Sequence, residues 1–589
     1  MTGYSAPTRD MRFVITELSD FAALTTLPGF EEVGVDVVDA ILAEAQRFSG
    51  QELAPLNSIG DSEGAVWDDG EVRVPQGFID AYRQFVEGGW NGVSSDPEFG
   101  GMGLPELLAA ATQEMWQSAN MAWALCPLLT AGAVQALTLH GSEQQKALYL
   151  PKLVSGEWPG TMNLTEPQAG SDLSAVRTRA VPEGDHYRIS GQKIFITWGE
   201  HQMAENIVHL VLARTPNAPA GVKGISLFVV PKFLPDAAGN PGERNDLRCV
   251  SIEHKMGIHG SPTCTMAFGD AGGAVGYLVG EEGRGLEYMF TMMNEARHKV
   301  GIQGLAIAER AYQQARDFAR ERVQGRPVGY TGEGGAPIIH HPDVRRMLLT
   351  MRAATEAMRA LAYRAALHFD FAQRHPDAEI RRTQQARADL LIPVVKSWCT
   401  ELGVEMASIG VQVHGGMGYI EETGAAQHLR DARITPIYEG TNGIQANDLV
   451  GRKLLRDRGA AMQSLLAELE EISKVGPADL QAPLAAAVGS LRQATEWLLS
   501  HGAQDPAAAQ ANSHHYLMLT GYTIGGALMA QAAAVAQTAL DSGSSEEFYR
   551  SKIAVARFYV QQLLPRAQAH AESVLAGAAP VLELAVEQL

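Results

Sequence analysis

The chain has 589 residues, of which 47 are Lys or Arg and 67 are Asp or Glu, giving a net charge of −20. This length exceeds the size at which one hydrophobic core usually stops growing, so several domains are expected. A strongly acidic surface repels phosphate backbones and anionic lipids, which argues against a protein that binds nucleic acid or a membrane surface.

Cysteine usage and the N-terminal sequence indicate the compartment. The four cysteines lie far apart and form no Cys-x-x-Cys pair, so the sequence predicts neither a metal site nor a disulfide framework. The first residues, MTGYSAPTRDMRFVITEL, lack the apolar core of a signal peptide. No window is expected to reach the length of a membrane span. We therefore expect a cytoplasmic protein without membrane insertion.

The first part of the chain is expected to be helical. After an N-terminal extension (residues 1–35), a helical domain is predicted over 36–159, where the stretch 107–139 is rich in Ala, Leu, Met and Trp. Ser142 is a candidate N-cap for a helix over residues 143–153.

The character of the sequence changes near Pro159. Segments 186–197, 206–214 and 224–233 are short, rich in β-branched residues and bounded by Gly or Pro. These features are typical of strands at the spacing of an all-β domain. They predict a central antiparallel β-sandwich or barrel over residues 160–283.

Helical periodicity returns near residue 285. Within 345–369, apolar residues recur at steps of one, three and four, which places them on one helix face. We expect a four-helix bundle over 284–455 and a further Ala-rich helical domain over 456–589. The predicted fold class is therefore α+β and multidomain.

Two segments near the predicted β domain are candidates for chemistry. In MNLTEPQAGSDLSAVRTRA (162–180), small residues form a tight turn that lets the backbone approach a flat or phosphate-bearing ligand, but an ordinary domain-junction loop would look the same. In GQKIFITWGE (191–200), aromatic side chains at a strand end suit packing on a planar cofactor, although a plain core strand shows the same alternation.

Two more candidates lie in the second helical region. In VQVHGGMGYI (411–420), a glycine pair interrupts a helical run, which is also what a simple helix end would show. In RDARITPIYEGTNGIQANDL (430–449), Glu439 follows the apolar stretch ITPIY, and lost solvation should raise the pKa of its carboxyl toward that of a useful base. The alternative is a helix-end Glu that serves as a cap or an ion-pair partner.

Together the four segments resemble the acyl-CoA dehydrogenase family, over roughly residues 35–455. The matching motifs are LTEPQAGSD (164–172), KIFIT (193–197) where the family usually has Lys-x-Trp-Ile-Thr, QVHGGMGY (412–419) and RDARITPIYEGTNGIQ (430–445). Four motifs in the right order and at the right intervals argue strongly against a chance similarity.

The resemblance implies an FAD-dependent desaturation of an acyl-CoA thioester. It implies that Glu439 removes the α-proton while the β-hydride leaves for flavin N5, and that the Glu439 backbone N–H and a flavin hydroxyl bind the thioester oxygen. The implied cofactor contacts are Met162, Leu164, Thr165, Ser171, Phe195, Thr197, Arg322, Gln412, Gly415, Gly416, Thr441 and Gly443. The implied substrate contacts are Ser171, Asn294, Arg297 and Gly440.

Three departures from the family pattern affect these roles, one of which is His341-Pro342 where a His-Gln is common. Phe195 replaces the usual Trp, and Trp198 is a candidate to compensate for it in packing on the flavin. The loop RVQGRPVGYTGEGGAP (322–337) replaces a compact aromatic turn. The nucleotide contact implied for Arg322, which the family makes across a subunit boundary, is therefore less secure than the contacts to the flavin ring.

The long C-terminal extension resembles that of the larger family members, including the 3-methylmercaptopropionyl-CoA dehydrogenase group. We expect it to cover within one subunit the face that family tetramers bury, which predicts a homodimer. Electrons are expected to pass to an electron-transfer flavoprotein. Three alternatives stay open: 3-methylmercaptopropionyl-CoA dehydrogenase specifically, an acyl-CoA oxidase that uses oxygen, and a silent acyl-CoA-binding protein. The intact Tyr438-Glu439-Gly440-Thr441 argues against the last.

Overall fold

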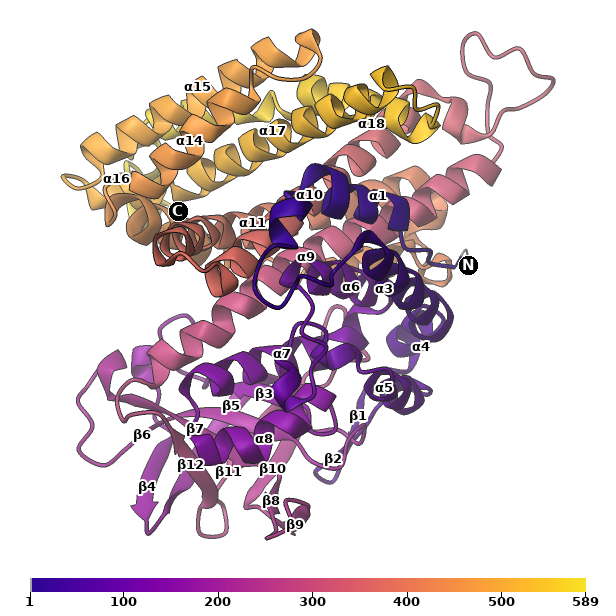
Figure 1. Cartoon of the computed structure of the whole chain (residues 1–589). Helices are drawn as coiled ribbons and strands as arrows, with labels where there is room; N and C mark the ends of the chain where they lie inside the picture. The colour runs from indigo at the N-terminus through magenta and orange to yellow at the C-terminus, as the bar shows by residue number, and fades with distance from the viewer. Residues whose placement is uncertain (1–2) are drawn as a thin grey trace. The chain divides into compact units, whose positions relative to one another are not determined.

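The computed structural model describes residues 3–589, so the first two residues of the expected N-terminal extension lie outside it (Figure 1). The backbone divides into two compact units, and each is described by itself. The β unit comprises residues 47–105 and 119–296. The helical unit comprises 3–46, 106–118 and 297–589. The five segments expected from the sequence stay a prediction.

The β unit combines a few helices with all of the strands. Its helices are α4 (Leu56–Glu63), α5 (Phe78–Glu87), α7 (Met121–His140), α8 (Glu143–Ser155) and the first part of α9 (Gly285–Glu321). Its strands are β1 (Val66–Asp68), β2 (Glu71–Arg73), β3 (Gly160–Asn163), β4 (Arg179–Glu183), β5 (His186–Thr197), β6 (Val208–Arg214), β7 (Ile225–Pro231), β8 (Phe233–Pro235), β9 (Pro241–Arg244), β10 (Leu247–Ile252), β11 (Thr263–Phe268) and β12 (Ala274–Val279). The Ser142 N-cap of α8 is confirmed, because its hydroxyl accepts from the Gln145 N–H in a full capping box.

The central sheet has eight strands in the order β10-β11-β5-β12-β7-β6-β3, with β4 paired to β5 and β6. Strand β5 changes partners near Gly191: its first half pairs with β4 and β12, and its second half with β11. The expectation of a purely antiparallel sheet was wrong in one respect, because β6 runs parallel to β3 and β4. The long connection from β3 to β6, which includes β4 and β5, makes a parallel pairing possible.

Buried apolar side chains from the strands form the core of the β unit. They include Val211, Phe228 and Met266, each with no exposed surface. The strands predicted over 186–197, 206–214 and 224–233 are confirmed as β5, β6 and β7. Their β-branched and aromatic residues predict strands because such residues fill the inner face of a pleated sheet.

The helical unit contains the longest helices of the chain. In chain order they are α1 (Thr8–Phe13), α2 (Phe21–Leu24), α3 (Val35–Phe48), α6 (Glu106–Ala119), the second part of α9, α10 (Pro342–Arg374), α11 (Ala378–His414), α12 (Ala425–Ala432), α13 (Asn442–Asp448), α14 (Ala460–Ile472), α15 (Ala478–His501), α16 (Pro506–Ala511), α17 (Ser513–Asp541), α18 (Glu547–Phe558), α19 (Arg566–Leu575) and α20 (Ala579–Leu582). Helices α3, α6 and α9 each have one end in the β unit.

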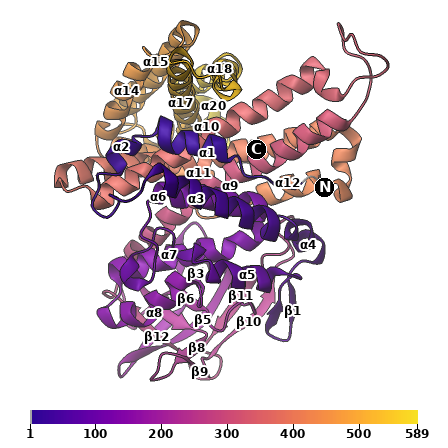
Figure 2. The same cartoon turned by 45° about the vertical axis from the view of Figure 1, so that its right-hand side comes forward.

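The C-terminal extension packs against the long helices that precede it. Helix α17 contacts α10, α11 and α13, and lies among α14, α15 and α18 in Figure 2. At the centre of this contact, Trp398 of α11 is fully buried and meets Tyr522 of α17 edge-on at 5.8 Å between ring centroids. Such burial of aromatic surface is a main source of packing energy between helices.

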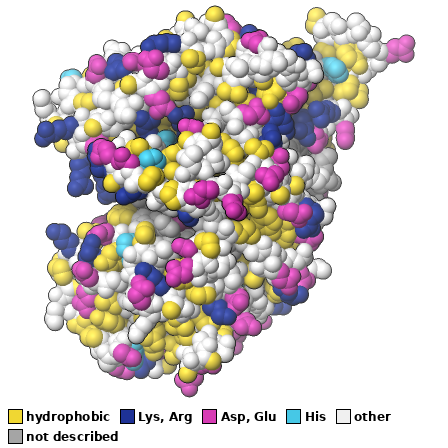
Figure 3. All heavy atoms as spheres, viewed as in Figure 1, with side chains coloured by type: hydrophobic (Ala, Val, Ile, Leu, Met, Phe, Trp, Pro, Cys, Tyr) yellow, Lys and Arg dark blue, Asp and Glu magenta, His cyan; other side chains and the backbone are white. Residues whose placement is uncertain are grey.

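Within residues 3–589, two helices, α7 and α17, are long and apolar enough to cross a membrane by length and composition alone. The expectation that no window reaches this length was therefore wrong. However, 78% and 83% of their respective apolar windows are buried inside the protein, as in the core helices of a globular fold. Acidic and basic side chains are interspersed over the face seen in Figure 3.

Candidate active site

The first candidate motif follows β3 in the β unit and is organised around a carboxylate. Met162 is buried in β3, Leu164 and Thr165 are half-buried just beyond it, and Ser171 is exposed. Glu166 accepts hydrogen bonds from the backbone N–H groups of Arg177 and Thr178, at 2.7 and 3.0 Å. The Thr178 hydroxyl donates to the same carboxylate at 2.6 Å. The turn is thus fixed by side-chain bonds to its own backbone.

A buried ion pair joins this turn to the strand motif. Lys193 of β5 has no exposed surface, and its Nζ donates to Glu166 Oε1 and to the Leu164 carbonyl, both at 2.9 Å. Burial by itself would raise the pKa of Glu166, but Lys193 and the surrounding donors lower it to about 2. Sequence reasoning missed this pair, although both residues lie inside the two motifs that it singled out.

Phe195 stands out at the end of β5 as an exposed aromatic residue. Its side chain is 57% exposed and its φ is +58°. A positive φ costs a bulky residue ~1–3 kcal/mol and persists only where the surroundings impose it. Here the pairing of β5 with β11 is irregular between Cys264 and Met266. The neighbouring Thr197 carbonyl accepts from the Thr161 hydroxyl at 2.7 Å, which ties β5 to β3.

Trp198 does not compensate for the Phe195 substitution. Its side chain is 1% exposed, and its indole N–H donates to the Ala122 carbonyl at 3.2 Å. The ring also packs edge-on against His201, with centroids 5.4 Å apart. The expectation that Trp198 packs on a cofactor was therefore wrong, because its ring is buried in the core of the β unit.

The candidate cofactor residues of the helical unit lie at helix ends. Arg322 follows α9, Gln412 lies near the end of α11, and both are exposed. Gly415 and Gly416 follow α11 and are also exposed. Gly415 has φ +59° and ψ −140°, a conformation open in practice only to glycine. The predicted cofactor roles of these residues stay predictions.

Glu439 occupies a strained turn between α12 and α13. Its φ is +56° and that of Gly440 is +83°. Thr441 then caps α13, because its hydroxyl accepts from the Ile444 N–H at 3.3 Å. The Glu439 carbonyl accepts long bonds of 3.4 Å from Arg297 Nε and Gln445 Nε2. Gly443 is exposed in the first turn of α13.

The Glu439 carboxyl has the properties of a poised base. The residue keeps part of its surface exposed, yet protein surrounds the carboxyl closely, and this desolvation raises its pKa. Arg297 and Lys396 act in the opposite direction, since a nearby cation favours the carboxylate. Among the described residues, nothing donates a hydrogen bond to this carboxylate, and the Glu439 N–H has no acceptor.

Two side chains near this turn, Lys396 and Asn442, were missed by sequence reasoning. Lys396 of α11 has no exposed surface, and its Nζ donates to Asn442 Oδ1 at 2.8 Å. A single Lys inside the apolar run LLIPVVKSW (390–398) was the available signal, because lysine is almost never fully buried without a partner.

The candidate substrate residues are divided between the units. Ser171 and Asn294 belong to the β unit, whereas Arg297 and Gly440 belong to the helical unit. Arg297 is 5% exposed and points at the Glu439 carbonyl. A Cβ atom at Gly440 would lie 2.8 Å from the Gln445 amide nitrogen, which would have to shift, and the φ of +83° at this position favours glycine. Their substrate roles stay predictions.

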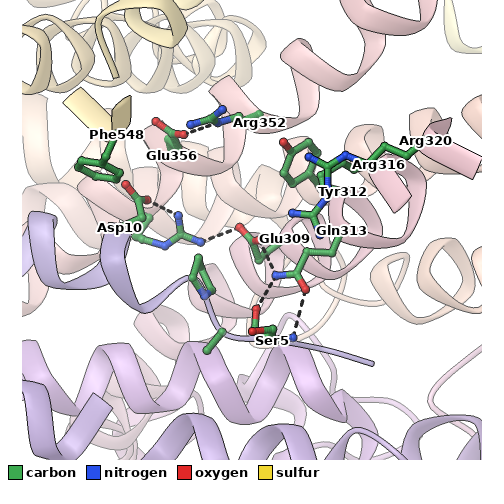
Figure 4. A pocket seen from close by; sticks show the side chains of 13 residues that line it. Ser5, Asp10, Glu309, Tyr312, Gln313, Arg316, Arg320, Arg352, Glu356 and Phe548 are labelled. Atoms are coloured by element: carbon green, nitrogen blue, oxygen red, sulfur yellow. Dashed lines mark hydrogen bonds and ion pairs between the residues drawn. The ribbon is translucent and has the colours of Figure 1, made fainter. Parts of the chain in front are cut away.

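A cavity of about 440 Å³ in the helical unit contains none of the predicted site residues (Figure 4). It lies among the N-terminal segment, α9, α10 and α18, and its inner wall is an ion-pair network. Arg359 pairs with Asp10 at 2.5 Å and with Glu309 at 2.8 Å, and Arg352 pairs with Glu356 at 2.8 Å. The contacts of Arg359 hold together segments that are distant in sequence.

Four family models match consecutive parts of the chain. They are the acyl-CoA dehydrogenase N-terminal domain (37–157), its middle domain (161–271), its C-terminal domain (283–454) and an "acetyl-CoA dehydrogenase C-terminal like" domain (460–585).

Individual relatives match over nearly the whole length. The chain is 52% identical to 3-methylmercaptopropionyl-CoA dehydrogenase of Ruegeria pomeroyi, covering 95% of this chain and 96% of the relative. It is 36% identical to a broad-specificity linear acyl-CoA dehydrogenase of Mycobacterium tuberculosis, covering 96% of each. The fold also resembles the solved acyl-CoA dehydrogenase of Bacillus anthracis complexed with FAD, with a TM-score of 0.72, 24% identity, and coverage of 97% of this chain and 92% of that one.

Proposed function

The chain belongs to the acyl-CoA dehydrogenase family of oxidoreductases that act on CH–CH groups, and from that premise we propose that it desaturates an acyl-CoA thioester between the α and β carbons with Glu439 as the base. The observation that carries this proposal is the Glu439 turn. It presents, side by side in one residue, a desolvated carboxylate and a backbone N–H, and no described residue donates a hydrogen bond to the first or accepts one from the second.

The cofactor of this family is FAD, and the residues of the β unit fit it. The exposed and strained Phe195 offers an aromatic face that soluble proteins rarely leave open, and a planar ring system would cover it. Met162, Leu164, Thr165, Ser171 and Thr197 would help to hold the group on this side. When bound, FAD supplies the acceptor for the hydride that leaves the β-carbon.

Glu439 would have two roles in the proposed reaction, one for its carboxylate and one for its backbone N–H. Its carboxylate accepts the α-proton, a step for which the raised pKa is suited because it brings the base closer to neutrality. Its backbone N–H donates to the thioester oxygen, where negative charge gathers as the proton leaves. The positive φ of Glu439 and of Gly440 keeps the backbone out of a helical conformation at this turn. The Glu439 N–H is therefore not used in a helical hydrogen bond.

The substrate is proposed to be a short acyl-CoA, with 3-methylmercaptopropionyl-CoA as the first compound to test. The support is the 52% identity to a relative with that activity. The broad-specificity linear acyl-CoA dehydrogenase at 36% identity makes linear chains the natural comparison. Turnover measured across acyl-CoAs of graded length, branching and thioether content would rank them.

Electron-transfer flavoprotein is the proposed acceptor, and oxygen is the alternative that would make the enzyme an oxidase. The two differ in what is produced, because reaction of the reduced cofactor with oxygen releases hydrogen peroxide. Peroxide formation is measured beside reduction of a dye or of purified electron-transfer flavoprotein. Rapid peroxide release with slow dye reduction would favour the oxidase.

The central experiment compares Glu439→Gln with Glu422→Gln. The amide at position 439 cannot accept the proton, so turnover should fall by several orders of magnitude while FAD and acyl-CoA binding persist. Glu422 is exposed and lies in a neighbouring loop, so its variant should match the wild-type rate. Near wild-type turnover of Glu439→Gln would show that the base lies elsewhere.

The remaining parts of the proposal concern assembly and architecture. We propose a homodimer, on the basis of the extension that packs on α10 and α11, and a cytoplasmic location. The finer fold description, a β-sandwich or barrel over 160–283 and a four-helix bundle over 284–455, belongs to the proposal as well.

A further inference from the structure

Lys396 is a buried cation, and no carboxylate of the described residues is in direct contact with it. It has no exposed surface, and the bond from its Nζ to the amide oxygen of Asn442 is 2.8 Å long. Removing an ammonium group from water costs several kcal/mol, and a neutral amide recovers only part of that. Burial lowers the pKa of Lys396 to about 7. A group this costly at the centre of the helical unit calls for a functional reason.

Asn442 connects Lys396 to the Glu439 turn. It is the first residue of α13, three positions after Glu439. Its Nδ2 donates to Glu401 Oε1 at 2.8 Å and to the Thr400 hydroxyl at 3.0 Å, both on α11. With the bond from Lys396, every polar atom of this side chain is engaged by one helix. Helix α11 therefore fixes the end of the strained turn that carries Glu439.

The charges around Lys396 come from several elements. Glu439 in the turn and Glu401 on α11 favour its charged form, and Arg297 on α9 opposes it. Asp448 at the end of α13 and Arg452 just beyond it act in turn on Arg297. From α17, Tyr522 is within electrostatic reach of Glu401. Lys396 and Arg297 are thus the two cations that act on the Glu439 carboxyl.

We propose that Lys396 is a positioning residue for Glu439, holding its turn through Asn442 and keeping its carboxylate ionised at neutral pH. The proposal rests on the function proposed for Glu439. Arg297 cannot replace Lys396 in this arrangement, because the Arg297 guanidinium is directed at the Glu439 carbonyl rather than at Asn442. Desolvation raises the pKa of Glu439, and Lys396 and Arg297 both lower it. If Lys396 loses its charge, Arg297 alone opposes the effect of desolvation.

The test is the pH profile of kcat/KM for purified holoenzyme with a good acyl-CoA substrate. In Lys396→Gln, which is neutral but can still donate to Asn442, the acid limb should move up by about one pH unit, as expected for removing an opposite charge near a carboxylate. Lys396→Met, the second neutral variant, should show the same shift. Lys396→Arg keeps the positive charge, so its acid limb should match that of the wild type. The matched control is Lys474→Gln, which removes an exposed partner of Glu471 and should leave the acid limb unchanged.

Asn442→Ala separates the anchoring role from the charge. It should lower kcat without moving the acid limb, since Lys396 keeps its charge. An unchanged acid limb in both neutral variants, with activity merely reduced, would overturn the proposal and leave Lys396 a structural residue. If Glu439→Gln were active, the proposed function itself would fall, whatever the Lys396 variants do. The two failures are therefore distinguishable.

Discussion

Two candidate functional residues, one in each unit, share an uncommon backbone conformation. Glu439 and Phe195 both have a positive φ, +56° and +58°, although neither is a glycine. A buried lysine lies near each of them: Lys396 bonds Asn442, three residues after Glu439, and Lys193, two residues before Phe195, bonds Glu166. Strain of this kind gathers where a side chain must be presented to a ligand.

The pH dependence of the wild-type enzyme reports on Glu439. Because a base must be ionised to accept a proton and burial raises the pKa of this carboxyl above 4.5, kcat/KM should fall with decreasing pH through a limb that lies above 4.5. The measurement is a pH profile under conditions where the protein stays folded. A limb at or below 4.5 would contradict the desolvation of Glu439.

The Lys193–Glu166 pair is expected to stabilise the β unit. Glu166→Gln leaves a buried ammonium without its counter-ion, so the free energy of unfolding should fall by ~3–5 kcal/mol. Because the pKa of Glu166 is lowered to about 2, its contribution is present above pH 4.5 and is lost as the pH falls from there toward 2. Denaturant unfolding at several pH values measures both. Glu183→Gln, which removes an exposed partner of Arg188, is the control and should change little.

At the scale of elements, one ion-pair network joins helices that are far apart in the sequence. Arg359 of α10 bonds Asp10 of α1, Glu114 of α6 and Glu309 of α9. Lys552 of α18 bonds Asp10 and Glu356 of the same group. The N-terminal segment and the C-terminal extension are thereby linked to the long helices.

Removing Arg359 should therefore weaken the whole helical unit. Arg359→Met leaves three buried carboxylates with fewer cations, and the expected loss in the free energy of unfolding is ~3–5 kcal/mol. The matched control on the same helix is Arg346→Met, whose partner Asp343 is exposed. A similar denaturation midpoint for both variants would show that the network contributes no more than a surface pair.

The contact of α17 with α11 depends on a glycine. A Cβ atom at Gly521 would lie 2.3 Å from the Trp398 ring, which is fully buried and cannot move away. Gly521→Ala should therefore cost ~1–3 kcal/mol of stability through overpacking. Gly489 of α15 has no atom within 4 Å of the same position, so Gly489→Ala should instead stabilise by up to ~1 kcal/mol. Thermal unfolding of the two variants tests this contrast, and equal melting temperatures would contradict it.

At the scale of the whole molecule, the extension is expected to set the oligomeric state. Its helix α17 covers α10 and α11, so those faces are not free for a second pair of subunits. Light scattering should give twice the mass of the chain. Deleting the residues after Lys453 should expose Trp398 and its neighbours, causing aggregation or a changed assembly. A stable tetramer of the full chain, or a soluble dimer after the deletion, would contradict this role.

The sequence by itself determined the order of helical, β and helical regions, the Ser142 cap and the family, because periodicity, capping and motifs are local signals. Only the tertiary structure decided that Trp198 is core, that β6 lies parallel to β3, and that the membrane-length α7 and α17 are buried. It also decided the Lys193–Glu166 and Lys396–Asn442 contacts, which join residues 27 and 46 positions apart. The physical reason is that the type of a residue determines whether it tends to be buried and whether it needs a polar or charged partner. Which residue becomes that partner depends on how the chain folds in three dimensions.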